Sequence, residues 1–568
     1  MDGVLYAPIL ILLIIAQFSA RADSDFHPIL AAQVVDDDGP SRNPEPAVRV
    51  RVRPRAIHYL NQVASNLLAE QLPRLMIPNI EHRLPADQGV IKLSRIRMSR
   101  FKRAEVHDIS TSAPDRITWL IKNMNIGLIG DLAGNVNILV PFDLTGEAEV
   151  LAEGLSFQIE NSVHRENNGS ARVTSLACHT TIRSVEVVNH NGGLFGLAVT
   201  VFKQGISDNV RTLLQGIICK KIRKYVDEDL NWKLAEVQTK STLADAISAN
   251  AIRGLSIPTP ALPEELSLEK FFGPTFSRDF VIDYTLAENP VCGDNEVELS
   301  SVGEISNSGR GGTPFPPPPL NWPTIRNDES MMWVLVSDYV PNSMLYHAYK
   351  QRLIKLHIDK HTPGVSTFLK TDCGDSMCIA DVIPQLSDKY PKANIELVFA
   401  ATRAPAMLFS QKNQGVISIN IGGVIILYVE LGTQKRQEAV FDLEIVADTL
   451  LSVKQNNVSG SVRLTRFELL NRFGNLEITN AELADIALLG GQLIENMVNE
   501  MLNSGVPIPI PSVLHLDNIR INVLSRKLLI RTDFGIDERR LSRIAEKTLF
   551  ASFPFGMDRS LRFHRRRW

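Results

Sequence analysis

Residues 193–234, GLFGLAVTVFKQGISDNVRTLLQGIICKKIRKYVDEDLNWKL, join a strand-like run to a long apolar helix pattern. The run Leu194–Phe202 is typical of a strand. The apolar residues after it recur in steps of three and four, which places most of them on one helix face. They are Ile206, Val210, Leu213, Leu214, Ile217, Ile218, Ile222, Tyr225, Val226 and Leu230. The stretch therefore predicts a long amphipathic helix packed on an extended sheet.

A cysteine inside this helix pattern suggests how the helix is held. Cys219 lies among the apolar positions, and Cys178 lies in the preceding strand-like segment, Arg172–Val188. A disulfide between them would pin the helix to the sheet, and closing a loop of this length contributes about 4 kcal/mol in the chain-entropy model.

Length and composition indicate a globular protein of several domains. The chain has 568 residues, of which 44% are hydrophobic and 22% charged, and its net charge is −3. A chain of this length exceeds one ordinary core, so we expect two or more domains. The net charge provides no general attraction to nucleic acid, and we expect no nucleic-acid partner.

The N-terminus has the pattern of a secretion signal. Ala7–Ala16 is an apolar run, and Ala20-Arg21-Ala22 is a small-x-small cleavage site, so we predict a signal peptide at 1–22 although Asp2 is acidic. The alternative is an uncleaved anchor, but the run is too short to span a bilayer comfortably. The mature protein is expected to be secreted and soluble.

Sequons and cysteines fit an extracellular protein. Asn168 and Asn457 begin the two N-x-S sequons and are the predicted glycosylation sites. Cys373 and Cys378 are close enough for a small-loop disulfide; a zinc site there is the lesser interpretation, because no second cysteine pair is present. Cys292 belongs to neither pair, and it is either a free cysteine or one that forms an intermolecular disulfide.

The first half of the chain predicts helix, strands and long helix in that order. Residues 23–46 have the composition of a disordered leader. Arg49, Arg51, Arg53 and Arg55 alternate with valines in a strand pattern, and a helix follows at 55–72. The signals from Ile77 to Thr200 are mostly those of β-strands.

The second half repeats this order after a Pro-rich segment at 235–330. A strand at Met332–Val336, a helix from Asn342 or Ser343 to about Lys355, several strands and a long helix at Ala481–Asn503 follow one another. The pattern is an internal repeat of whole domains. The expected divisions are signal peptide 1–22, leader 23–46, first domain 47–255, linker region 256–330, second domain 331–535 and basic-aromatic tail 536–568.

At this point the chain resembles the secreted family of bactericidal/permeability-increasing protein, lipopolysaccharide-binding protein, phospholipid transfer protein and cholesteryl ester transfer protein. The resemblance runs from about Val48 to Phe534. It rests on four stretches that share their order and spacing with the family. Cys178 and Cys219 stand where the family places its shared disulfide. The other three are the helix Arg55–Leu72 with Leu75–Asn79, Phe315–Pro319 with Trp333–Tyr339, and Ile508–Pro511 with Val513–Val523. The Cys373–Cys378 segment, followed by Tyr390-Pro391, resembles invertebrate-type members.

The resemblance implies an α+β boomerang. Two barrel domains, each a highly twisted antiparallel sheet wrapped around a long helix, would be joined by a central sheet, and each would hold acyl chains in an apolar slot. The expected lining residues are Ile57, Leu60, Leu67, Val210, Leu213, Leu214, Ile217, Leu489, Leu493 and Met497. The alternative for each residue is that it fills a dry core.

Catalytic and cofactor signatures are missing from the sequence. It contains no G-x-S-x-G, H-E-x-x-H or P-loop motif, and we expect neither an enzyme nor a cofactor. His357 and His361 have i, i+4 spacing, but the segment has a strand or loop pattern, so a metal site there is disfavoured.

Two regions depart from the endotoxin-binding members of the family. The loops expected at the N-terminal tip, Pro85–Gly89 and Gly130–Asn137, contain no lysine or arginine, although the neighbouring strand is basic (Lys92, Arg95, Arg97, Arg100, Lys102 and Arg103). The tail ends in Arg565, Arg566, Arg567 and Trp568, which suit contact with an anionic membrane; the alternative is a solvated tail.

These patterns together predict a secreted protein that holds phospholipid acyl chains and transfers lipid between membranes or lipid particles. The alternative within the family is an innate-immunity protein that binds lipopolysaccharide. The alternative of another class is a secreted scaffold or adhesion protein without lipid.

Overall fold

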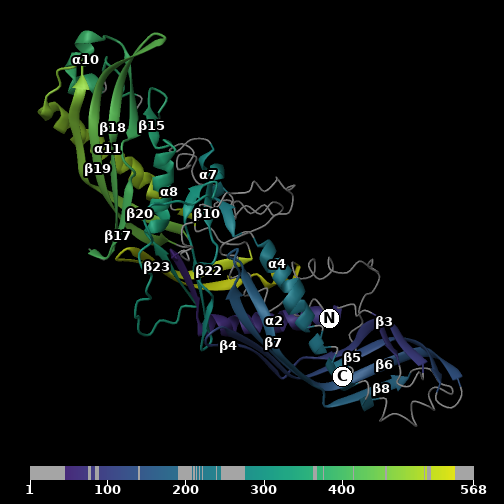
Figure 1. The fold of residues 1–568 in the computed structure, drawn as a ribbon. Helices are drawn as coiled ribbons and strands as arrows, with labels where there is room; N and C mark the ends of the chain where they lie inside the picture. Colours follow the sequence, from purple (N-terminus) through teal and green to yellow (C-terminus); the bar gives the residue numbers. More distant parts are fainter. Residues whose placement is uncertain are drawn as a thin grey trace.

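The structure is a computed structural model of the 568-residue chain, shown as a ribbon in Figure 1. It describes residues 45–74, 79–83, 89–137, 141–189, 207–208, 211–212, 214–216, 218–220, 222–237, 239–244, 275–362, 367–374, 377–412, 415–454, 457–503, 506–507 and 513–543. The molecule is elongated, with one sheet-rich domain at each end and a third sheet between them (Figure 1). The α+β prediction is confirmed.

The N-terminal domain is built on a long antiparallel sheet. Its strand order is β2-β3-β5-β6-β7, with β4 paired to β5 and β8 paired to β6. The strands are β2 (Ile80–Arg83), β3 (Gly89–Lys102), β4 (Val106–Ser112), β5 (Arg116–Asn137), β6 (Pro141–Arg165), β7 (Ala171–Thr181) and β8 (Ser184–Asn189). The expected loop at Gly130–Asn137 is wrong, because these residues continue β5 and pair with both β3 and β6.

Two helical segments lie against this sheet. Helix α2 (Pro54–Gln71) begins with Pro at its first position, buries one apolar face, and is followed by the 3₁₀ turn η1 (Leu72–Arg74), which contains Pro73. The long helix predicted from the sequence is described in part up to residue 224. It continues as a π-helical turn, η3 (Tyr225–Leu230), and as α4 (Asn231–Glu236). The strand expected at Leu194–Phe202 lies outside the described residues.

The C-terminal domain repeats the sheet-and-helix arrangement. Its sheet has the order β15-β16-β18-β19-β20-β21, with β17 paired to β18. The strands are β15 (Lys355–Ile358), β16 (Asn394–Ala401), β17 (Ala406–Ser410), β18 (Val416–Leu431), β19 (Gln434–Lys454), β20 (Asn457–Gly474) and β21 (Val506–Pro507). The helices are α8 (Tyr339–Lys350), the short α9 (Ile379–Val382) and α10 (Pro384–Lys389), and the long α11 (Asn480–Asn503).

Helix α8 differs from its prediction in both bounds. The expected cap residues, Asn342 and Ser343, lie inside the helix. The Asn342 amide donates to the Met407 carbonyl (2.6 Å), and the Ser343 hydroxyl accepts from the Ile305 amide (2.9 Å). These two side chains therefore fasten α8 to its neighbours instead of capping its N-terminus.

The central sheet takes strands from three parts of the chain. Its order is β11 (Val291–Gly293), β12 (Glu296–Ser301), β1 (Val48–Val52), β14 (Met332–Ser337), β23 (Lys527–Ile536) and β22 (Leu514–Leu524). A small sheet of β13 (Ile305–Asn307), β10 (Phe280–Asp283) and β9 (Lys240–Thr242), with α7 (Phe276–Asp279), lies beside it. The segment 256–330 thus supplies two strands of the central sheet, and the predicted N- and C-terminal domains supply the other four.

Candidate functional site

The predicted slot residues on α2 are buried in one apolar cluster. Ile57, Leu60 and Leu67 are 4%, 3% and 6% exposed and pack in one cluster with the inner face of the N-terminal sheet and with the helical residues 218–230. Leu214 is partly buried against the same cluster. Val210, Leu213 and Ile217 lie outside the described residues. We call this cluster the N-terminal core.

The C-terminal domain is filled differently. One buried cluster lies around α9, α10 and Leu483 at the start of α11, and a second, smaller one contains Phe409, Ile417 and Val523 near the central sheet. Between them, two rungs of paired residues run across β18, β19 and β20. They are Ile421–Ile445–Phe467 and Ile419–Ala447–Leu464, and all except Ala447 remain partly exposed.

The β20 members of these rungs, Leu464 and Phe467, pack against α11 at Gly490 and Gly491. A Cβ atom on Gly491 would lie 3.6 Å from Phe467 and 3.7 Å from Leu464, and the adjacent Gly490 would lie 4.0 Å from Phe467. The inner surface here is apolar and incompletely covered by the described side chains. We call these five partly exposed residues, Ile419, Ile421, Ile445, Leu464 and Phe467, the open rungs. Leu489 is partly buried; Leu493 and Met497 lie on α11, but their side chains are outside the described parts.

Each domain fastens its long helix, by an asparagine and an acid four positions before it, to strand residues that pair with a neighbouring strand on one side only; sequence reasoning missed both sets. In the N-terminal domain, Asn231 accepts from the Val173 amide (2.8 Å) and donates to the Val173 carbonyl (2.7 Å). Asp227, one helical turn earlier, accepts from the Ser175 amide (3.0 Å). Asn231 also donates to the carbonyls of Val226 and Asp227, both at 3.1 Å, within the π-helical turn.

In the C-terminal domain, α11 holds β20 in the same manner. Asn499 accepts from the Val462 amide (2.6 Å) and donates to the Val462 carbonyl (2.9 Å), and Glu495 accepts from the Leu464 amide (2.8 Å). We call each set an edge clamp. The sequence signal is an acidic residue four positions before an asparagine, present on both long helices.

Both predicted cysteine pairs are disulfide-bonded in the structure. Cys178 on β7 joins Cys219 in the helical segment 218–220, with 5.7 Å between the Cα atoms. Cys373 joins Cys378, directly before α9. Cys292 is a buried free cysteine on β11, and burial, with the nearby Asp115 charge, raises its pKa to about 11. It is therefore unsuited to form an intermolecular bridge in the folded protein.

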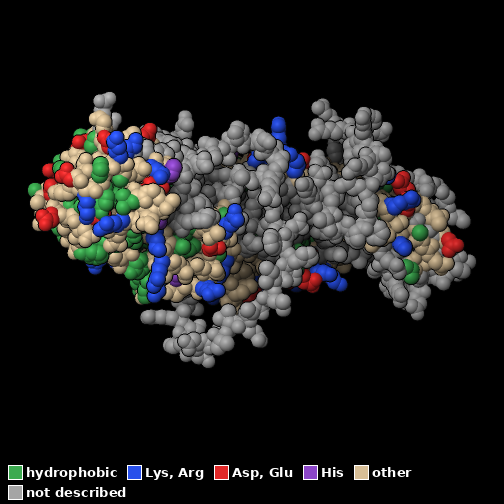
Figure 2. Space-filling model, turned by 90° about the horizontal axis from the view of Figure 1, so that it is seen from above, with side chains coloured by type: hydrophobic (Ala, Val, Ile, Leu, Met, Phe, Trp, Pro, Cys, Tyr) green, Lys and Arg blue, Asp and Glu red, His purple; other side chains and the backbone are tan. Residues whose placement is uncertain are grey.

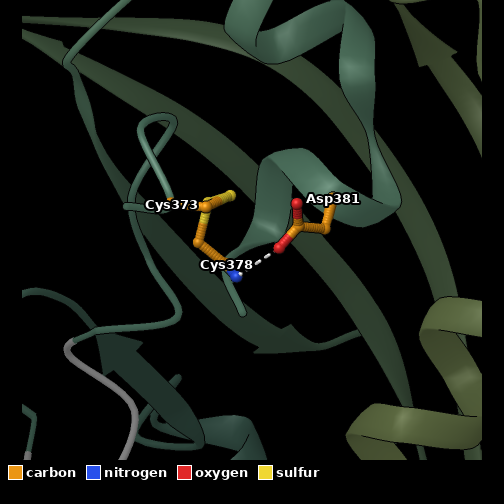
Figure 3. A group of neighbouring side chains, drawn as sticks. All are labelled: Cys373, Cys378 and Asp381. Carbon is orange, nitrogen blue, oxygen red and sulfur yellow. Dashed lines mark hydrogen bonds between the residues drawn. A yellow bond between two sulfur atoms is a disulfide. The ribbon is translucent and has the colours of Figure 1, made fainter. Parts of the chain in front are cut away.

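Among the described residues, one group has the spacing of metal ligands, and its chemistry does not fit a metal. Figure 3 shows Cys373 and Cys378 joined to each other, with Asp381 beside them. The disulfide removes both thiolates, which are the metal-binding form of cysteine. The Asp381 carboxylate accepts the Cys378 amide (3.0 Å), so it caps α9. His357 lies on β15 and contacts Glu396 (3.1 Å).

The basic residues of β3 are largely neutralised by neighbouring acids. Arg95 pairs with Asp131, Arg97 with Glu147 (3.3 Å) and Arg100 with Glu149 (3.3 Å). These acids lie on β5 and β6 and face the arginines across the sheet. The ion pairs therefore favour a solvated strand face, and an anion would have to compete with them.

The sequons occupy turns or strand starts. Asn168 is exposed between β6 and β7, and its side-chain oxygen accepts from the Ser170 amide (3.0 Å) and hydroxyl (2.7 Å). Asn457 begins β20. Both positions remain predictions of glycosylation.

The predicted tail begins inside the protein core. Residues 538–543 are helical, Leu541 is 0% exposed within the N-terminal core, and the Gln71 amide donates to the Ser542 hydroxyl (2.8 Å). Leu541 and Ser542, which the sequence assigned to the tail, are therefore part of the packed structure. Arg565, Arg566, Arg567 and Trp568 lie outside the described residues.

The C-terminal domain also exposes apolar side chains on its surface. Figure 2 shows hydrophobic side chains interspersed with charged ones over this end of the molecule. The most exposed are Met377 (62%), Leu488 (63%), Phe473 (57%) and Leu470 (56%). In the described parts of the chain, no helix is long and apolar enough to cross a bilayer.

Comparison with known proteins agrees with this architecture. The profile of the LBP / BPI / CETP family, N-terminal domain, matches residues 56–231, and that of the C-terminal domain matches residues 275–536. The human lipopolysaccharide-binding protein is 22% identical over 87% of this chain and 95% of its own length. The bactericidal permeability-increasing protein of Sebastes schlegelii is 20% identical over 86% and 95%. A crystal structure of lipopolysaccharide binding protein aligns with a TM-score of 0.48 and 17% identity, over 87% of this chain and 99% of that one. The two profiles together cover most of the sequence, so the chain belongs to the LBP / BPI / CETP family.

Proposed function

We propose that this protein is a secreted lipid carrier, which holds phospholipid acyl chains against its inner apolar surfaces and transfers lipid between membranes or particles. The observation that carries the proposal is the set of open rungs in the C-terminal domain. They form an apolar surface of partly exposed side chains, of which Phe467 and Leu464 lie next to Gly491 on α11. The names of the relatives, which include lipopolysaccharide-binding proteins, support a lipid as the ligand.

The physical task is to carry acyl chains through water. Exposing one CH₂ group costs about 0.8 kcal/mol, so a 16-carbon chain costs on the order of 12 kcal/mol. An apolar surface that accepts the chain removes most of this barrier. The task needs no nucleophile and no cofactor, so we propose a non-enzymatic protein.

The first experiment is organic extraction and lipid mass spectrometry of the protein purified from culture medium. We expect intact phospholipid in stoichiometric amount, and a polypeptide that begins at Asp23. Folded, disulfide-bonded protein without lipid would instead favour the scaffold alternative.

A variant that fills the proposed C-terminal slot tests where the lipid lies. Gly491→Leu places a side chain over the open rungs and should lower the bound lipid by up to one molecule per protein. The matched control is Gln492→Leu, which places a leucine at an exposed position of the same helix. Equal lipid content in both variants would remove the C-terminal slot from the proposal.

Docking on an anionic membrane is the remaining part of the proposal. The exposed apolar residues of the C-terminal domain and the basic-aromatic residues beyond 543 support it, at about 1 kcal/mol per basic residue near the surface. Truncation after Arg543 keeps Leu541 in the core. It should weaken binding to phosphatidylserine vesicles and reduce the dependence of binding on salt. Unchanged affinity would contradict this role of the tail.

A further inference from the structure

Two polar side chains face each other inside the N-terminal domain. Asn161 on β6 is paired with Ser175 on β7. Along β6, Asn161 lies between Ile159 and Val163, which are 1% and 8% exposed and belong to the N-terminal core. Alternate residues of a strand share a face, so the Asn161 side chain points toward that core.

Both side chains carry a polar atom that is buried without a partner. Asn161 is 3% exposed, and neither its Oδ1 atom nor the Ser175 Oγ atom has a hydrogen-bond partner among the described residues. The Ser175 amide is used by the edge clamp, through Asp227. Buried polar groups are nearly always hydrogen-bonded, and an unpaired one costs roughly 1–3 kcal/mol, so an adjacent pair indicates an occupant.

We propose that Asn161 and Ser175 bind the polar linkage of a lipid acyl chain that carries its own hydrogen-bond donor, a secondary amide or a hydroxyl. The proposal rests on the lipid-carrier function and specifies its ligand. Asn161 Oδ1 accepts from the amide N–H or the hydroxyl, and Ser175 Oγ donates to the neighbouring carbonyl or hydroxyl oxygen. An ester linkage has only acceptors, so it can pair with Asn161 only if the side-chain amide turns over and donates through Nδ2.

The charge around the pair selects a neutral group. Asp227, held on Ser175, is an acid, and the flanking residues Ile159, Val163 and Val173 are apolar. A phosphate placed here would lose its hydration and meet a carboxylate. The lipid headgroup therefore lies elsewhere, and the pair recognises the linkage between chain and headgroup.

The test compares two lipids with the same phosphocholine headgroup. Sphingomyelin has an amide and a hydroxyl, whereas phosphatidylcholine has two esters. Delipidated full-length protein is incubated with equimolar mixed vesicles, re-isolated and extracted. We expect about a tenfold preference for sphingomyelin, corresponding to one satisfied buried group. A parallel arm with lipid A, whose hydroxyacyl chains are amide-linked, distinguishes a bacterial from a cellular source by which lipid competes better.

Variants separate this linkage site from lipid binding as such. Asn161→Leu with Ser175→Ala replaces both polar groups by apolar ones of similar size and should abolish the preference while keeping phosphatidylcholine bound. Ser162→Ala, one position along β6 on the other face, should keep the preference. Equal binding of both lipids by the unaltered protein, as expected if water occupies the pair, would overturn the inference and leave the carrier function intact. Binding of neither lipid would overturn the carrier function itself.

Discussion

The N-terminal and C-terminal domains fasten their long helices alike and close their interiors differently. In both domains, an asparagine side chain on the helix forms hydrogen bonds with the backbone amide and carbonyl of one strand residue. An acidic side chain one helical turn earlier accepts from the amide of the residue two positions further along that strand. The interiors differ because the N-terminal core is continuous, whereas the C-terminal domain has two separate clusters with the open rungs between them.

This difference separates what the fold requires from what a ligand requires. An edge strand has unpaired backbone groups, and the clamp satisfies them in both domains. Packing density is under no such constraint, so one domain can leave apolar side chains partly exposed. We therefore expect stability to depend on the clamps and disulfides, and the lipid held by the C-terminal domain to depend on the open rungs.

Removing the disulfides gives the largest expected difference between the domains. The Cys178–Cys219 bridge spans 41 residues and the Cys373–Cys378 bridge spans 5. In the chain-entropy model, replacing each pair by serine costs about 4 and about 2 kcal/mol of unfolding free energy, respectively. Denaturant titration measures both. A Cys292→Ala background prevents thiol exchange, and equal losses would contradict the loop-length argument.

Substituting the clamp asparagines gives the second-largest expected loss of unfolding free energy. Asn231 is 8% exposed, and Asn231→Leu leaves the Val173 amide and carbonyl unpaired, at a cost of about 3 kcal/mol. Asn499 is less buried, so Asn499→Leu should cost about 1 kcal/mol, because water reaches the exposed groups. Hydrogen exchange of the edge-strand amides localises each effect. If the two variants were equally destabilised, burial would not be what distinguishes the clamps.

The clamps also show where prediction from sequence stopped. Apolar spacing was sufficient to predict α2 and α11, because an amphipathic face follows from local periodicity. It could not predict that Asp227 and Asn231 turn toward β7, since their partners are backbone groups with no sequence signature. The pairing of Asn161 with Ser175 depends on the register of β6 and β7, which is likewise set by the whole sheet.

Non-local contacts explain the errors in the prediction as well. The segment Gly130–Asn137 has the glycine and asparagine content of a loop, yet it is held as a strand by partners on both sides, in β3 and β6. The start of the predicted tail looks polar and basic, but Leu541 enters the N-terminal core beside α2. In both cases tertiary packing outweighs local composition.

Between pH 7 and pH 5, acid should destabilise the N-terminal domain through His107. Burial lowers the pKa of His107 from 6.5 to about 4. Its Nδ1–H donates to Asn61 on α2 (2.6 Å), and its Nε2 accepts from the Trp119 indole (3.1 Å), so the ring is neutral. Between pH 6.5 and 4 the unfolded chain binds a proton that the folded chain does not. The stabilisation is therefore complete above pH 6.5 and falls with pH through this window.

The expected loss is about 2 kcal/mol between pH 7 and pH 5. Denaturant titrations at the two pH values measure it, with tryptophan fluorescence as the probe because Trp119 contacts the ring. His107→Gln should remove this part of the pH dependence. In the C-terminal domain, His361→Gln at an exposed position is the matched control. An unchanged pH slope in His107→Gln would show that other groups produce it.

The smallest expected effect comes from alanine substitutions at two helix glycines, which distinguish a change in helix stability from a change in the room for a ligand. Gly216 and Gly491 lie in the helical segments that pack on the two sheets; a Cβ on Gly216 meets nothing within 4 Å, and one on Gly491 meets Phe467 at ordinary contact distance. Alanine at either position should stabilise its helix by about 0.5–1 kcal/mol, because glycine is the more flexible residue. Only Gly491→Ala adds a methyl group over the open rungs, so only that variant should also bind less lipid. If Gly491→Ala gained stability and kept its full lipid content, the two glycines would be equivalent, and the missing side chain on α11 would have no role in holding a ligand.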